Sequence, residues 1–128
     1  MEARQYENSF RCSYIYPPGI MRFEIIDMAE IDIKEVDAMH AFSMEFTQGR
    51  QYATLFVAGP MLNISKEARE HGTNSKFHKG LVCQAIIINS LAHRILGNFI
   101  VRFNRGITET RLFSTEAEAI KWLEKKLI

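Results

Sequence analysis

The chain has 128 residues, of which 47% are hydrophobic and 24% are charged. This length suits a single domain over residues 1–128 with a core of its own. Its 16 basic and 15 acidic residues leave a formal net charge of +1. Such a balance excludes a strong overall field toward nucleic acid or an anionic membrane surface, and we expect neither as a partner.

The first residues, MEARQYENSF, are polar and include acids, unlike the basic and then apolar start of a signal peptide. We expect residues 1–8 to form a flexible segment. No stretch reaches the roughly 18 apolar residues of a membrane span, so we expect no membrane insertion. Cys12 and Cys83 lie in apolar runs, which indicates reduced core thiols in a cytoplasmic protein.

A hairpin and a helix are predicted first. Residues 9–16 alternate apolar and polar side chains, as a half-buried strand does. The sequence PPG at 17–19 predicts a turn into a second strand at 20–27. Asp32, with Glu35 three residues later, has the spacing of a capping box, so we expect a helix to start there.

Strands and helices alternate in the rest of the chain. The continuous apolar runs at 52–58 and 81–88 are typical of central strands that are covered on both faces. A short strand at 110–113 follows them. This alternation predicts an α/β fold in which a single layer of mixed sheet starts with an N-terminal hairpin. The helices that follow are expected to be capped by Ser65, Ser90 and Thr115.

The helix after Ser90 carries an apolar stripe, which we expect to face the core. Gly97 stands in the middle of this helix, where it costs about 1 kcal/mol relative to alanine. We therefore expect close packing at Gly97, or a bend of the helix. The residues of the stripe recur every four positions at Leu91, Ile95, Phe99 and Phe103, and Ala92, Leu96 and Ile100 widen it.

Familiar catalytic and cofactor motifs are missing from the sequence. The seven glycines form neither of the glycine-rich phosphate-binding patterns. Neither G-x-S-x-G nor S-x-x-K occurs, and there is no C-x-x-C or H-E-x-x-H spacing for a metal. We therefore predict a protein that is not an enzyme, with no catalytic residues, no metal and no cofactor. The histidines considered as ligands are His40, His71, His78 and His93.

One stretch is biased toward arginine. Four arginines stand against a single acid, Glu109, between positions 94 and 111. Guanidinium groups suit phosphates and carboxylates, so this stretch is a candidate anion-binding face. The alternative, which we favour, is the solvated side of an amphipathic helix. The four candidates are Arg94, Arg102, Arg105 and Arg111.

Three segments carry a resemblance to a known family. ISKEARE at 64–70, RILGNFIVRFNRG at 94–106 and TRLFSTEAEAIKWL at 110–123 resemble a family of small uncharacterised bacterial proteins, known mostly from Bacteroidetes. The order of elements resembles the SpoIIAA-like fold of anti-sigma factor antagonists and STAS domains. The resemblance implies this fold, whereas the family has no established activity.

Ser65 is the residue on which the resemblance bears most directly. Anti-sigma factor antagonists carry a phosphorylatable serine after an aspartate, in the loop that follows the central strand. Ser65 matches that serine by position, but Ile64 stands in place of the aspartate, and Lys66 and Glu67 replace small residues. Ser65 is thus a candidate phosphoacceptor or only a helix N-cap, and we favour the cap alone.

Together these features predict a non-enzymatic STAS-like module that binds another protein or a second copy of itself. A homodimer is one expected form. If Ser65 is modified, the module has a regulatory role. The alternative is a small apolar-ligand binder, because the fold is also similar to lipid-carrying SEC14-type domains. Nine phenylalanines and six methionines suit an adaptable apolar cavity. Ligand cavities of that kind have volumes of roughly 300 Å³ or more.

Overall fold

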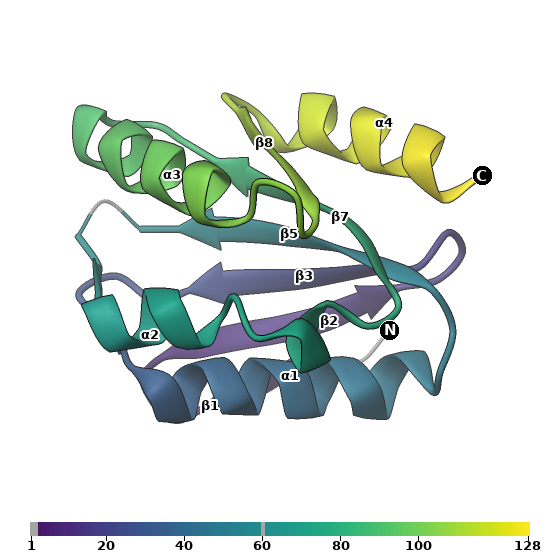
Figure 1. The fold of residues 1–128 in the computed structure, drawn as a ribbon, viewed down its shortest axis with the longest axis horizontal. Coiled ribbons are helices and arrows are strands. Elements are labelled where there is room, and N and C mark those ends of the chain that lie inside the picture. The colour runs from purple at the N-terminus through teal and green to yellow at the C-terminus, as the bar shows by residue number, and fades with distance from the viewer. Residues whose placement is uncertain (1–2, 60) are drawn as a thin grey trace.

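A six-stranded mixed sheet forms the centre of the molecule, as seen in the computed structural model, which describes residues 3–59 and 61–128 (Figure 1). The strands β1, β2 and β3 pair antiparallel, and β3, β5, β7 and β8 pair parallel in that order. The strands are β1 (Ala3–Tyr6), β2 (Phe10–Ile15), β3 (Ile20–Ile25), β5 (Tyr52–Ala58), β7 (Leu81–Ile87) and β8 (Glu109–Phe113). A separate parallel pair joins β4 (Glu30–Ile31) to β6 (Asn63–Ile64).

Among the described residues, four helices cover the two faces of the sheet unequally. They are α1 (Ile33–Thr47), α2 (Lys66–His71), α3 (Leu91–Phe103) and α4 (Glu116–Leu127), with a short 3-10 turn η1 (Ser75–His78) after α2. On one face, Phe10, Phe23 and Tyr52 pack against α1. On the other face, Ala119 and Leu123 of α4 pack against β5 and β7. Figure 1 shows α1 beside the antiparallel strands, and α3 and α4 beside β8.

Local capping chemistry sets where the helices begin. The Asp32 carboxylate and the Glu35 side chain form the predicted capping box at the start of α1. The side chains of Ser65, Ser90 and Thr115 each accept a backbone N–H three residues ahead. Each of these bonds satisfies a donor that the first turn of a helix leaves unpaired. All four predicted helix starts are confirmed.

The two cysteines, Cys12 and Cys83, are buried and free. Burial raises the pKa of the Cys12 and Cys83 thiols to about 11. At neutral pH both thiols are therefore protonated, and a thiol in that form is a poor nucleophile. Their prediction as reduced core residues is confirmed.

The N-terminal segment is a strand where flexibility was expected. Residues 3–6 form β1 and pair with β2 from Ala3 opposite Ser13 to Tyr6 opposite Phe10. Arg4 lies over the ring of Phe42, 5.3 Å from its centroid. A polar edge strand gives little periodic signal, because the ladder and these contacts, rather than its own apolar residues, hold it in place. Residues 1–2 lie outside the described residues.

The orientation of α3 also differs from the prediction. Leu91, Ile95 and Phe99 were expected in the core, but 73%, 59% and 44% of their surfaces are exposed. The helix instead turns Gly97 toward β8, where a Cβ would lie 2.8 Å from Leu112 Cδ2. Close packing at Gly97 is thus confirmed, and it decides which side of α3 faces inward. Ala92 is also exposed, so the prediction is wrong there too. Leu96 and Ile100 are half-buried, as predicted. The Phe103 side chain lies outside the described part of the structure.

Candidate functional site

The N-termini of α1 and α2 meet at a hydrogen bond between their capping residues. The short β4–β6 pair brings the two starts together, with Ile31 opposite Ile64. The Ser65 hydroxyl donates to Asp32 Oδ1 at 2.8 Å and accepts from the Ala68 amide at 3.0 Å. Ser65 is therefore confirmed as an N-cap, and its hydrogen is already committed to a carboxylate.

This junction has an electrostatic consequence. Two hydrogen bonds lower the pKa of Asp32 from its ordinary value. The one from Ser65 has the larger effect, and the one from the Ile33 amide has the smaller. A phosphate on Ser65 would replace the bond to Asp32 with a contact between two anions. The helix N-terminus favours such a charge, whereas the carboxylate opposes it. Phosphorylation of Ser65 stays a prediction.

Replacing Ser65 with alanine is expected to lower the free energy of unfolding by about 1 kcal/mol, the usual cost of losing an N-cap side chain. Because the folded-state pKa of Asp32 is lowered, its bond to Ser65 stabilises the protein above the ordinary carboxyl pKa and is lost as pH falls through the folded value. The effect of the substitution should therefore be largest near neutral pH. Urea unfolding across this pH range measures it, with the exposed Ser114→Ala as control. An equal cost at all pH values would contradict the role of Asp32.

The four arginines proposed as an anion site do not share one contact. Arg94 and Arg102 are exposed on α3, eight residues or about 12 Å apart along the helix axis, and Arg105 follows that helix. Arg111 stands on β8, where it lies over the ring of Trp122 and pairs with Glu109 at 3.5 Å. Arg111 is thus engaged with α4, whereas the other three lie on or just after α3.

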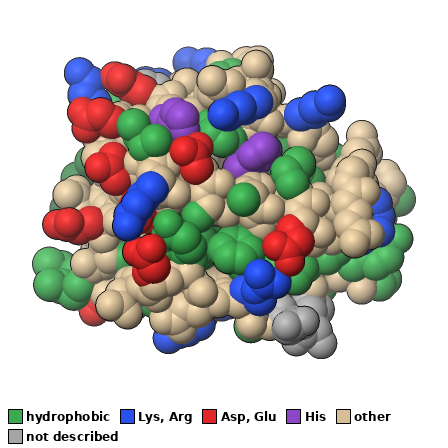
Figure 2. All heavy atoms as spheres, turned by 90° about the horizontal axis from the view of Figure 1, so that it is seen from below, with side chains coloured by type: hydrophobic (Ala, Val, Ile, Leu, Met, Phe, Trp, Pro, Cys, Tyr) green, Lys and Arg blue, Asp and Glu red, His purple; other side chains and the backbone are tan. Residues whose placement is uncertain are grey.

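His71 and His78 have different hydrogen-bond partners, and the rings of His40 and His71 both contact Phe77. His71 Nε2 lies 2.8 Å from Asp37 Oδ1, and this hydrogen bond lowers the pKa of Asp37. His78 bridges Gly72 O and the Thr108 hydroxyl. Within residues 3–59 and 61–128, no three His, Cys, Asp or Glu side chains gather into a group that could hold a metal ion. Figure 2 shows the face of the molecule that points downward in Figure 1. On this face, acidic, basic and histidine side chains are intermixed with apolar ones.

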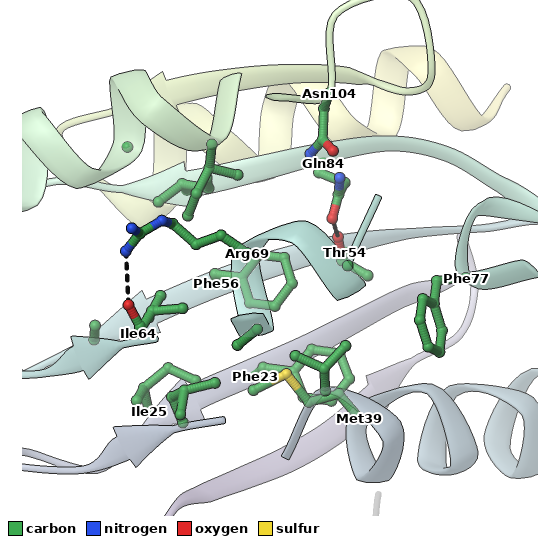
Figure 3. Close-up of a pocket in the computed structure, with 18 of the residues that line it drawn as sticks. Phe23, Ile25, Met39, Thr54, Phe56, Ile64, Arg69, Phe77, Gln84 and Asn104 are labelled. Atoms are coloured by element: carbon green, nitrogen blue, oxygen red, sulfur yellow. Dashed lines mark hydrogen bonds between the residues drawn. The ribbon is translucent and has the colours of Figure 1, made fainter. Parts of the chain in front are cut away.

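A cavity lies between the sheet and the helices α1, α2 and α3 (Figure 3). Its volume is about 210 Å³, below the roughly 300 Å³ typical of ligand sites. The cavity is therefore smaller than a lipid-carrying site requires, which counts against the SEC14-type alternative and leaves room only for a smaller ligand. The side chains that line it are largely apolar and include Phe23, Ile25, Met39, Phe56, Leu96 and Ile100.

Polar side chains form one part of the cavity wall. Thr54 Oγ1 donates to Gln84 Oε1 at 3.2 Å, and Gln84 Nε2 donates to Thr110 Oγ1 at 3.4 Å. Asn104 Nδ2 donates to the same hydroxyl at 3.3 Å. In Figure 3, Thr54, Gln84 and Asn104 form a row away from Arg69 and Ile64. Since Thr54 and Asn104 are linked through Gln84 and the Thr110 hydroxyl, these side chains form a satisfied polar wall.

The order of strands and helices defines an α/β domain of the SpoIIAA-like fold. The structure is similar to the crystal structure of an uncharacterized protein from the DUF3478 family with a SpoIIAA-like fold from Shewanella loihica PV-4. The similarity covers 96% of this chain and 98% of the other, with a TM-score of 0.62 and 14% sequence identity. At this identity the similarity establishes the fold alone, and it confirms the predicted fold class.

Family membership follows from the sequence itself. Residues 14–127 match the family model described as domain of unknown function DUF7793. The chain therefore belongs to this family, which confirms the resemblance to an uncharacterised family. A search of the curated proteins finds no match. Neither the family model nor the similar structure describes a catalytic activity. Among the described residues, no helix combines the length and the apolar character needed to cross a membrane.

Two cavity residues, Arg69 and His93, were not predicted to face a cavity, although His93 was among the histidines considered as metal ligands. Arg69 stands in a short charged helix and His93 in the first turn of α3, where both look like surface residues. A weaker signal was present in the strands. Thr54 and Gln84 are polar side chains in the middle of continuous apolar runs, and buried polar groups need partners.

Proposed function

We propose that this domain is a non-enzymatic binding module that recognises another protein through the exposed side of α3. The observation that carries the proposal is the exposure of three large apolar side chains on α3, namely Leu91, Ile95 and Phe99. Their spacing of four residues places them along one side of the helix. Exposed apolar patches of this kind, with polar residues around them, mark interaction surfaces.

The charge around this surface indicates the chemistry of the partner. Arg94 and Arg102 are exposed on the same helix, and Arg102 lies 6.0 Å from the centroid of the Phe99 ring. Between Ser90 and Thr108 the sequence contains no aspartate or glutamate. A partner segment with apolar side chains flanked by carboxylates would complement this surface. The exposed arginines then serve as the anion-binding residues, at the edge of a protein interface.

Site-specific photo-crosslinking in the native cell tests the proposal. A photoreactive residue at the exposed position Asn98 should crosslink to one partner, whereas the same residue at Lys121 on α4 should not. With the purified partner, the double substitution of Leu91 and Ile95 by glutamine should weaken binding at least tenfold. Equal crosslinking from both positions would contradict the proposal. A homodimer that the double substitution dissociates would identify the partner as a second copy of the chain.

Regulation through Ser65 is a separate part of the proposal. The hydroxyl stands at the N-terminus of α2, and its phosphorylation would break the bond to Asp32. The junction between α1 and α2 would then change its charge at a point where both helices begin. Intact-mass and phosphosite analysis of protein from its native cell tests this part, and a consistent absence of phosphate on Ser65 would exclude it.

Binding of a small molecule is a second candidate function, favoured by the cavity. The cavity is apolar over most of its surface and is built from the sheet and three helices. An engineered apolar cavity of about 150 Å³ takes up benzene, so a volume of about 210 Å³ admits a somewhat larger ligand. This function does not depend on the exposed side of α3.

A further inference from the structure

The cavity beneath α3 contains two buried nitrogens with unused hydrogen-bonding capacity. Among the described residues, Arg69 Nε and His93 Nδ1 are the buried side-chain atoms without a hydrogen-bond partner. Both residues line the same cavity. Unpaired buried polar atoms are costly and uncommon in folded proteins. Their occurrence together, in the wall of one apolar cavity, indicates that a polar group of a ligand belongs there.

Arg69 supplies the charge. Its Nη1 donates to the Ile64 carbonyl at 2.7 Å, and its guanidinium lies over the Phe99 ring, 5.3 Å from the centroid. Figure 3 shows the side chain extending from α2 toward Ile64, with Phe56 beside it. None of the ion pairs formed by the described residues includes Arg69. A half-buried guanidinium without a carboxylate favours an anionic partner, to which Nε–H can donate.

His93 supplies a second polar contact. Only 6% of its surface is exposed, and Nε2 lies 2.7 Å from the Gly59 carbonyl. Because a carbonyl only accepts, Nε2 carries a hydrogen and donates it. Nδ1 is then a free hydrogen-bond acceptor, and it can share one proton with the carboxyl group of a ligand.

The rest of the cavity wall determines the polarity and the size of the part of the ligand that lies away from Arg69. Phe23, Met39 and Phe56 present apolar side chains to the cavity, as Figure 3 shows. The polar wall of Thr54, Gln84 and Asn104 is already bonded internally. The part of the ligand away from Arg69 should therefore be apolar, and the volume of about 210 Å³ limits it to about the size of one aromatic ring or a short alkyl chain.

We infer that this cavity is a binding site for a small monocarboxylate with an apolar body, held at its carboxylate by Arg69 and His93. The inference rests on the small-molecule function above and is independent of the surface of α3. It goes beyond that function because it specifies an anionic group and the two side chains that bind it.

Titration with two matched probes tests the inference. Phenylacetate and phenylacetamide share the same ring and differ in charge, and binding is followed by the amide NMR shifts of residues that line the cavity. Phenylacetate should bind at least tenfold more tightly than phenylacetamide. Equal affinities would show a cavity for small apolar molecules without an anion site, which overturns the inference but leaves the small-molecule function standing. Absence of binding by both would overturn the two together.

Matched variants separate the roles of charge and space. Arg69→Gln should weaken phenylacetate at least tenfold and leave phenylacetamide unchanged. Arg11→Gln is the control, because Arg11 is an exposed arginine on β2 that does not line the cavity. If Arg69→Gln unfolds the protein, Arg69→Lys keeps the charge and removes the planar Nε–H, and should still weaken phenylacetate. Ile86→Phe, which fills the cavity, should weaken both probes. Phenylacetate binding that survives Ile86→Phe or either Arg69 variant overturns the inference.

Discussion

Replacing Phe23 with alanine is expected to lower the free energy of unfolding by about 3–5 kcal/mol, the usual cost of truncating a fully buried phenylalanine. Phe23 is 1% exposed. Its ring stacks on Phe56 with centroids 5.6 Å apart and meets Phe10 edge-on at 5.7 Å. The substitution removes both contacts. Because Phe23 lines the cavity, the space left by its ring enlarges that cavity.

Urea unfolding followed by the fluorescence of the single tryptophan, Trp122, measures this loss. Phe23→Leu should cost only part of it, because most of the side-chain volume is kept. Leu91→Ala is the surface control and should change stability by no more than about 0.5 kcal/mol. If Phe23→Ala proves no more costly than Leu91→Ala, the helices must close over the vacated space, and the cavity described above would not persist.

The helix starts could be predicted from the sequence because they depend on neighbouring residues. Asp32 with Glu35, and Thr115 with the acids that follow it, satisfy their own first turns. The central strands could also be predicted, because a strand that is covered on both faces has a continuous apolar run in its sequence. The polar strand β1 was missed because its place at the sheet edge depends on Phe10 and Phe42, which lie elsewhere in the chain.

The orientation of α3 could not be predicted from its apolar pattern. The helix has apolar residues on two sides, one through Leu91 and Ile95 and the other through Leu96 and Ile100, so the pattern indicates a helix but not its inner side. Gly97 resolves the ambiguity, because the side without a Cβ approaches Leu112. A glycine in the middle of a helix was therefore a better guide to the packed side than the larger residues.

The cavity was beyond prediction because its lining residues come from nine elements between β3 and α3. Arg69 lies in a helix of six residues, four of them charged or histidine besides Arg69 itself, and nothing local distinguishes it from its neighbours. Its role depends on Phe99, which lies on another helix and approaches Arg69 only in the folded chain. The Ser65 cap and the Arg69 contact lie on the same short helix, yet only the cap is encoded locally.

Replacing Gly59 with alanine is expected to cost about 1–3 kcal/mol, because an added methyl group would overpack a site whose backbone cannot move away. A Cβ at Gly59 would lie 2.8 Å from Asp27 Cβ and 2.9 Å from Asp27 Cα. Asp27 is held in turn by its bond from the Met61 amide at 2.9 Å, and Met28 and Met61 are joined by a backbone hydrogen bond.

Gly72→Ala is the matched control for this substitution. Gly72 has φ of −65°, and a Cβ there would have its nearest contact at 3.4 Å, from Ala68 O. The substitution should therefore leave stability unchanged or raise it slightly. Equal effects of the two substitutions on urea unfolding would contradict the close approach of Gly59 to Asp27.

The Gly59→Ala variant also connects the backbone at the end of β5 to the cavity. The Gly59 carbonyl accepts from His93 Nε2 and so fixes the ring whose other nitrogen has no protein partner. A displaced Gly59 should shift this ring, so Gly59→Ala should weaken phenylacetate binding, whereas Ser114→Ala, at an exposed position outside the cavity wall, should not. Because Arg69 has no bond to Gly59, a loss confined to Gly59→Ala would isolate the contribution of His93 from that of the guanidinium.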